Sequence, residues 1–67
     1  MEQYQLRVVA EEMELSERLE RLRAFIEDAK FRNLPFAEQE RMGKQLRAMD
    51  TYQEALRERI AAWGETK

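Results

Sequence analysis

The segment KFRNLPFAEQE, residues 30–40, decides the fold of this chain because it holds the only proline. Proline disfavours helical geometry at the residue before it and suits the first position of a new helix. Asn33 supports a turn just before the proline because asparagine tolerates left-handed backbone angles. We therefore predict a turn over residues 30–34 and a new helix from Pro35.

Apolar residues on both sides of this turn recur every three or four positions, the spacing that places them on one face of a helix. The residues between them are mostly strong helix formers such as Glu and Arg. The sequence therefore predicts an all-α chain with one domain over residues 1–67, made of a helix at residues 2–29 and a second helix at residues 35–63. The two stripes contain Val8, Leu15, Leu19, Leu22 and Ile26, then Met42, Leu46, Met49, Tyr52 or Gln53, Leu56, Ile60 and Trp63.

The two stripes match when the chain folds back on itself as an antiparallel two-helix hairpin. In this register Tyr4 lies near Trp63, and Leu19 lies near Met49. The acidic residues Glu11 and Glu12 interrupt the first stripe. In this register they lie near Arg57 and Arg59, and a charge at a helix seam needs a partner. Two interpretations stay open: a cross-helix ion pair that fixes the register, which is favoured, or an arginine held in place to bind an anion.

The length of the chain predicts self-association. A chain of 67 residues seldom builds a core large enough to stabilise itself, and with no Cys and no His it lacks disulfides and the usual metal ligands. We expect the hairpin to assemble into a symmetric helical-bundle homo-oligomer. The expected subunit interface consists of apolar residues that lie off the hairpin seam: Leu6, Val9, Met13 and Phe25.

The composition argues against several classes of function. Without His or Cys the chain lacks the commonest general base and the commonest thiol nucleophile, so we predict no enzyme, no catalytic residues, no metal and no cofactor. The net charge of −2 gives no positive field that would draw the chain to DNA, RNA or a membrane. The sequence contains no apolar run of about 20 residues and no signal peptide, so a cytoplasmic protein is expected.

The end of the hairpin opposite the turn is the candidate ligand-binding site. Nucleobases stack on aromatic rings, and phosphates accept paired hydrogen bonds from guanidinium groups. The alternative interpretation is that the aromatic residues only cap the core. The residues that the register brings to this end are Tyr4, Arg7, Arg57, Arg59 and Trp63.

Beyond these patterns, the order and spacing of five segments resemble a known protein family over residues 4–63. The chain is similar to the small phage proteins with a helical-hairpin domain that act as anti-CBASS and anti-Thoeris nucleotide sponges. Glu12 departs from the pattern, because the resemblance leads us to expect a basic residue there. The segments are YQLRVVAEEMEL (4–15), RLERLRAFI (18–26), F(x2)L(x3)EQER (31–41), QLRAMDTY (45–52) and LRERIAAW (56–63).

The resemblance implies a non-enzymatic inhibitor of host antiviral signalling in the cytoplasm of an infected bacterium. Members of the family assemble, commonly as hexamers, and bind cyclic di- or trinucleotides or cyclic ADP-ribose signals in pockets between subunits. The contact residues of other members do not transfer position by position to this chain. Two alternatives stay open: a hairpin oligomer that acts as a protein–protein adaptor without a small ligand, and, less favoured, an RNA-binding hairpin dimer.

Overall fold

A computed structural model describes residues 1–64 of the chain, and the ordered elements in that range are helices. They are α1 (Gln3–Glu27), α2 (Ala29–Arg32) and α3 (Phe36–Trp63). The predicted all-α class is therefore confirmed. The helices predicted at residues 2–29 and 35–63 correspond to α1 and α3, with bounds that differ by one or two residues at three of the four ends.

The connection between the long helices differs from the predicted turn at residues 30–34. Asp28 has an extended backbone, and its carboxylate Oδ1 accepts a hydrogen bond of 2.8 Å from the backbone N–H of Lys30. An aspartate in this position is a favourable N-cap, so it ends α1 and begins the short helix α2. Asn33 does not use the left-handed angles that asparagine tolerates, since its backbone is right-handed with φ of −86°.

The link from α2 to α3 is closed by a side chain of α3. Gln39 Nε2 donates hydrogen bonds to the backbone carbonyls of Leu34 at 2.9 Å and of Arg32 at 3.3 Å. Carbonyls at the end of a helix lack partners within the helix, so this amide satisfies the one of Arg32 at the end of α2, and it also holds the carbonyl of Leu34 in the link. Pro35 has φ of −54° and precedes the first residue of α3, as its fixed geometry favours.

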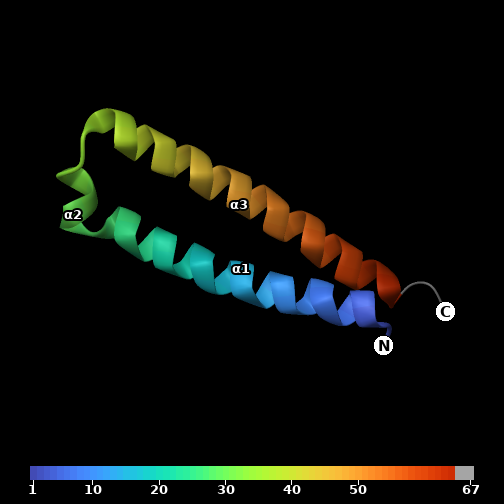
Figure 1. The fold of residues 1–67 in the computed structure, drawn as a ribbon. Helices are drawn as coiled ribbons and strands as arrows, with labels where there is room; N and C mark the ends of the chain where they lie inside the picture. The colour runs from blue at the N-terminus through green and yellow to red at the C-terminus, as the bar shows by residue number, and fades with distance from the viewer. Residues whose placement is uncertain (65–67) are drawn as a thin grey trace.

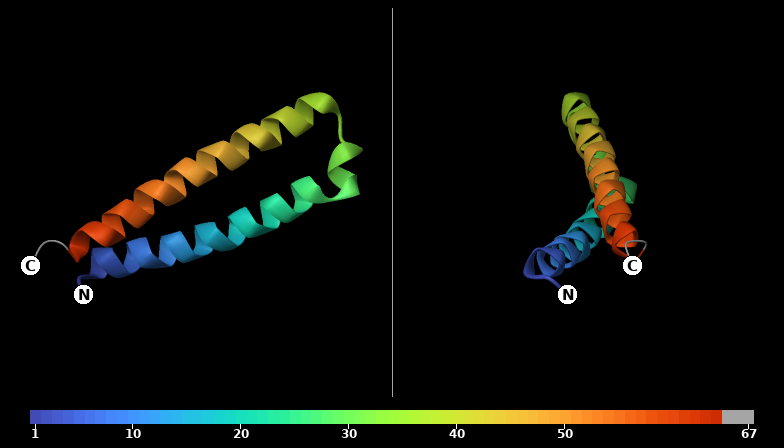
Figure 2. Two further views of the ribbon diagram at one scale, coloured as in Figure 1. Left: turned by 180° about the vertical axis from the view of Figure 1, so that it is seen from behind. Right: turned by 90° about the vertical axis from the view of Figure 1, so that its right-hand side faces the viewer.

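The helices α1 and α3 lie side by side and run in opposite directions, with both termini at one end and α2 at the other (Figures 1 and 2). The result is a rod with extents of 51 × 15 × 15 Å. Its core consists of four buried apolar residues, of which Leu19 is 0% and Leu56 is 1% exposed; the other two are Val8 and Leu15. Burial of each such leucine contributes roughly 1.5–3 kcal/mol relative to an exposed side chain.

The buried residues of the core extend from the terminal end to Leu19, just past the midpoint of α1. Half-buried residues pack against them: Leu46, Met49, Ile60 and Trp63. Closer to the turn, Leu22, Ile26 and Met42 of the same stripes are half-buried rather than buried. The two long helices therefore share one apolar seam that is well covered at one end and partly open at the other.

Candidate functional site

An aromatic pair closes the terminal end of the rod. The rings of Tyr4 and Trp63 lie 6.1 Å apart between centroids, at an angle of 88°. Edge-to-face contact of this kind is favourable because the positive edge of one ring meets the negative face of the other. Trp63 packs against the core, while Tyr4 is 51% exposed. The pair therefore caps the core and still offers the tyrosine ring to a ligand.

Arg7 and Arg59 lie at the same level of the rod, on the same flank as this pair. Arg7 falls three residues after Tyr4 and four before Glu11, a spacing that places all three on one face of α1. On α3, Arg59 falls four residues before Trp63 and seven after Tyr52, again on one face.

Two contacts between α1 and α3 show that Arg7 and Arg59 lie at the same distance along the rod. Tyr4 meets Trp63 on one side of the two arginines, and the hydroxyl of Tyr52 donates a hydrogen bond to the Glu11 carboxylate on the other. Arg7 and Arg59 are both exposed, and within residues 1–64 neither takes part in an ion pair. The flank therefore presents two positive charges on facing helices beside an exposed aromatic ring.

Arg57 lies on the other flank of the rod from Arg59. The two residues are two positions apart, which is a rotation of about 200° around the helix, so their side chains point to nearly opposite sides of α3. Its Nε donates a hydrogen bond of 3.0 Å to Glu12 Oε2, and the Glu12 side chain is 16% exposed. This is the cross-helix ion pair that the sequence favoured. The arrangement separates Arg57 from Arg59, so the five predicted site residues do not form one cluster.

Glu12 is the centre of a polar network between the long helices. Its Oε2 also accepts hydrogen bonds from Ser16 Oγ at 2.8 Å and from Gln53 Nε2 at 3.4 Å, and Gln53 donates to Ser16 Oγ at 2.7 Å. These hydrogen bonds, first from Ser16 and then from Arg57, lower the pKa of the Glu12 carboxyl from its ordinary value. The network therefore holds Glu12 ionised and joins α1 to α3 at one register.

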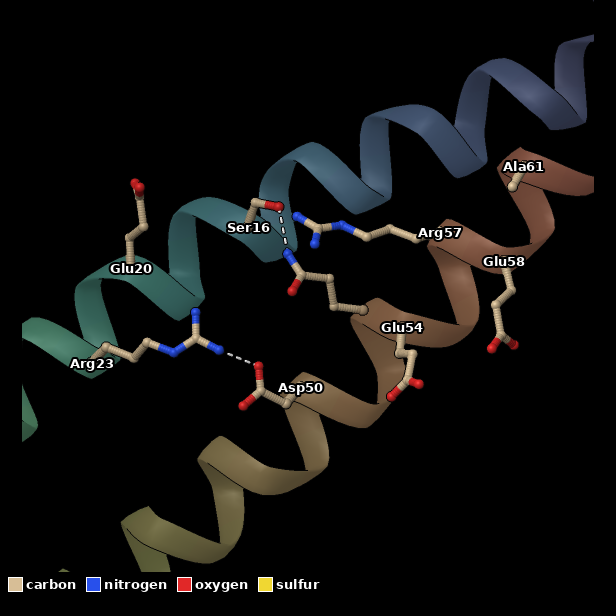
Figure 3. Close-up of a pocket in the computed structure, with 9 residues that line it drawn as sticks. Ser16, Glu20, Arg23, Asp50, Glu54, Arg57, Glu58 and Ala61 are labelled. Atoms are coloured by element: carbon tan, nitrogen blue, oxygen red, sulfur yellow. Dashed lines mark hydrogen bonds and ion pairs between the residues drawn. The ribbon is translucent and has the colours of Figure 1, made fainter.

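A groove runs along this second flank, between α1 and the outer side of α3 (Figure 3). Arg23 of α1 and Asp50 of α3 form an ion pair across it. Sequence reasoning missed this ion pair. It left the stripe position between Met49 and Leu56 open between Tyr52 and Gln53, and Gln53 is the one that is buried. Four carboxylates and two guanidinium groups line the groove, so its net negative charge repels a phosphate. The lining residues are Ser16, Glu20, Arg23, Asp50, Gln53, Glu54, Arg57, Glu58 and Ala61.

The residues expected at a subunit interface differ in their surroundings. Leu6 is 55% and Met13 is 60% exposed, which is unusual for large apolar side chains on a helix without a partner. Val9 is half-buried beside them. Phe25 is half-buried and packs edge-to-face against Phe31 of α2, with centroids 6.3 Å apart. Phe25 therefore has a partner within its own chain, whereas Leu6 and Met13 remain open.

Within residues 1–64, no group of three or more acidic, His or Cys side chains is placed to hold a metal ion. Within the same range, none of the helices combines the length and the apolar character needed to span a membrane.

Comparison with known proteins gives one match. The sequence model of a family described as Sequestin matches residues 2–62, which is nearly the whole chain. No curated protein and no solved structure matches the chain. The family match agrees with the resemblance to phage nucleotide sponges that the sequence suggested, and the family name indicates a sequestering protein.

Proposed function

The chain belongs to the Sequestin family, and on that premise we propose that it sequesters cyclic nucleotide second messengers. In this proposal it is a phage-encoded, non-enzymatic inhibitor that starves a host antiviral effector of its activator in the bacterial cytoplasm. Sequestration requires affinity without turnover, and a chain with no His and no Cys is suited to that task.

The observation that carries the proposal is the pair of exposed arginines, Arg7 and Arg59, at one level of the rod. Like charges on facing positions are destabilising by themselves, and a bound anion relieves the repulsion. Guanidinium groups bind phosphate through paired hydrogen bonds, and a cyclic dinucleotide carries two phosphates. The exposed ring of Tyr4, next to Trp63, offers a base a surface for stacking.

Arg57 has a more restricted role in this proposal. Glu12 neutralises it, so a ligand phosphate gains Arg57 only by displacing a carboxylate that is already hydrogen-bonded. Glu12 stands where the resemblance implies a basic residue, which means that this flank of the chain is less attractive to anions than in similar hairpins. Arg7 and Arg59 are therefore the main phosphate ligands, and Arg57 is secondary.

A pocket for such a ligand requires more than one copy of the chain. Ligand sites enclose most of the surface of a small molecule, and a rod of two helices presents only shallow surfaces. We propose that hairpins associate through the strip of Leu6, Val9 and Met13, and that the neighbouring subunit closes the site over Arg7 and Arg59. Phe25 lies about a third of a turn away from this strip around α1 and packs against Phe31, so it is not part of the proposed contact. A hexamer is the expected assembly.

The proposal is tested by titrating the purified protein with cyclic dinucleotides, cyclic trinucleotides and cyclic ADP-ribose in a calorimeter. We expect binding of at least one, and a melting temperature that rises with its concentration. Binding of none, with no thermal shift, favours the adaptor function, for which exposed Leu6 and Met13 would serve as a protein-docking surface.

The substitution Arg59→Glu tests the site itself. We expect it to weaken binding at least about 100-fold, because it removes a charge-assisted contact and adds a repulsive charge. The oligomer should persist, since Arg59 is exposed. Arg21→Glu, an equally exposed charge reversal on α1, is the matched control and should leave binding unchanged. If Arg59→Glu binds as tightly as the parent protein, the site lies elsewhere.

A further inference from the structure

The outward face of α3 carries opposite charges at its two ends. Lys44 and Arg47 line a surface groove near the turn, and Glu54 and Glu58 line the groove near the termini. These four residues and Thr51 follow one another at intervals of three and four positions, so they lie on one face of the helix, here called the outer α3 face. All five are exposed.

The charges on the outer α3 face have no partners within the described chain. The ion pairs among residues 1–64 are Arg23 with Asp50, Arg41 with Glu38, and Arg57 with Glu12, none of which uses the four charged residues of this face. The hydroxyl of Thr51 donates a hydrogen bond of 3.0 Å to the carbonyl of Arg47. Its polar hydrogen is therefore satisfied within the helix, which removes an obstacle to burial at the centre of the face.

The pattern of charge is complementary to itself. Lys44 lies seven residues before Thr51 and Glu58 lies seven after it, while Arg47 and Glu54 lie four before and three after. A second α3 that runs antiparallel and crosses at Thr51 places Lys44 opposite Glu58, and Arg47 opposite Glu54. A two-fold axis makes each pair occur twice. A parallel arrangement would instead place like charges together, which disfavours association.

The side chains beside these charges allow the helices to approach closely. Ala48 and Ala55 flank Thr51 on this side of α3, and both are exposed. Small residues at a helix contact reduce the distance between axes, so the long Lys, Arg and Glu side chains can reach across. This packing supports the electrostatic argument and does not replace it.

We propose that α3 packs against α3 of a second copy of this chain, antiparallel and with the two-fold axis at Thr51. The contact is distinct from the apolar strip on α1, and two different self-contacts in one chain build closed assemblies larger than a dimer. The proposed sponge requires an oligomer but not this contact, so the inference holds whether or not the assembly binds nucleotides.

Two charge-reversed variants test the contact: Lys44→Glu/Arg47→Glu and Glu54→Lys/Glu58→Lys. Each variant places like charges together in the proposed arrangement. Sedimentation velocity over a dilution series should show dissociation at roughly 30-fold higher protein concentration than for the parent, because two pairs are reversed on each side of the axis. An equimolar mixture of the two variants should restore association. The control Arg21→Glu/Lys30→Glu reverses two exposed charges elsewhere and should sediment like the parent.

A variant that carries all four reversals separates a lost contact from a damaged fold. It regains the complementary pattern with the signs exchanged, so it should sediment like the parent, and all variants should keep the parent's helical circular dichroism. The proposal is overturned if both double variants sediment like the parent. It is equally overturned if neither the mixture nor the fourfold variant restores association.

Discussion

The terminal half and the turn half of the rod use similar sequences in different ways. The buried residues of the described chain extend from the terminal end only as far as Leu19, just past the midpoint of α1, and the contacts of Glu12, Ser16 and Tyr52 that join α1 to α3 lie in the terminal half. The turn half carries the same kind of apolar stripe, yet Leu22, Ile26 and Met42 are only half-buried.

The difference shows that the two halves leave different apolar surfaces for neighbouring copies to cover. The terminal half supplies its own core and a polar network that fixes the register, and it leaves open the strip of Leu6, Val9 and Met13 through which we propose that hairpins associate. The turn half leaves apolar area that nothing within residues 1–64 covers, and we attribute its completion to neighbouring copies. Changes in the two halves should therefore produce different kinds of failure.

The largest effect should come from introducing a carboxylate either at a fully buried position or at a half-buried position of the same stripe closer to the turn. Leu19→Asp buries an unpaired charge at a fully buried position, so we expect loss of more than about 4 kcal/mol and no cooperative unfolding transition. Leu22→Asp, three residues away and half-buried, should keep a helical chain but lose the dependence of its melting temperature on protein concentration. Circular dichroism melts at several concentrations distinguish the two. If Leu22→Asp keeps the parent's concentration dependence, no neighbour covers the turn half.

A smaller effect should come from the polar network of the terminal half. The folded chain lowers the pKa of Glu12, so the stability that the carboxylate contributes is present above its ordinary pKa and is lost as the pH falls through the lowered value. Glu12→Gln should cost about 1–2 kcal/mol at pH 7 and make the melting temperature less sensitive to acid. Glu17→Gln, at an exposed position of α1, is the control. Equal acid sensitivity in Glu12→Gln and the parent would show that the network does not stabilise the fold.

The smallest effect should come from the cap of α2 at the turn. Asp28→Ala removes the acceptor for the Lys30 N–H and should cost about 1 kcal/mol in chemical denaturation. Asp28→Asn, which keeps an oxygen acceptor, should retain most of that stability. Equal losses for the two variants would mean that the carboxylate acts by its charge rather than as a cap.

The long helices and their register were predictable because one proline and two regular stripes determine them. Tyr4 meets Trp63, as the register predicted. A cross-helix ion pair was also predicted, but the sequence left open which acid and which arginine form it, and the structure pairs Glu12 with Arg57. The short helix α2 was missed because four residues are too few to show periodicity, although Asp28 ahead of them was a usable cap signal.

The candidate site was predicted less well, and the reason is geometric. Sequence reasoning grouped residues by their level along the rod, whereas a site also depends on the flank. Arg57 and Arg59 are at similar levels, but their two-residue spacing places them on different sides of α3. The rotation of about 100° per residue on a helix is known from the sequence alone, so it was a usable signal that Arg57 and Arg59 belong to different sides of α3. Nothing in one sequence shows which exposed residues a neighbouring copy covers, so the interface remained a prediction.

The central claim is that neighbouring copies complete this chain, and sedimentation equilibrium of the purified protein tests it most directly. We predict a single closed oligomer at micromolar concentration, with a melting temperature that rises as the protein is concentrated. A monomer that is fully helical and melts cooperatively at the same temperature at every concentration would contradict the claim.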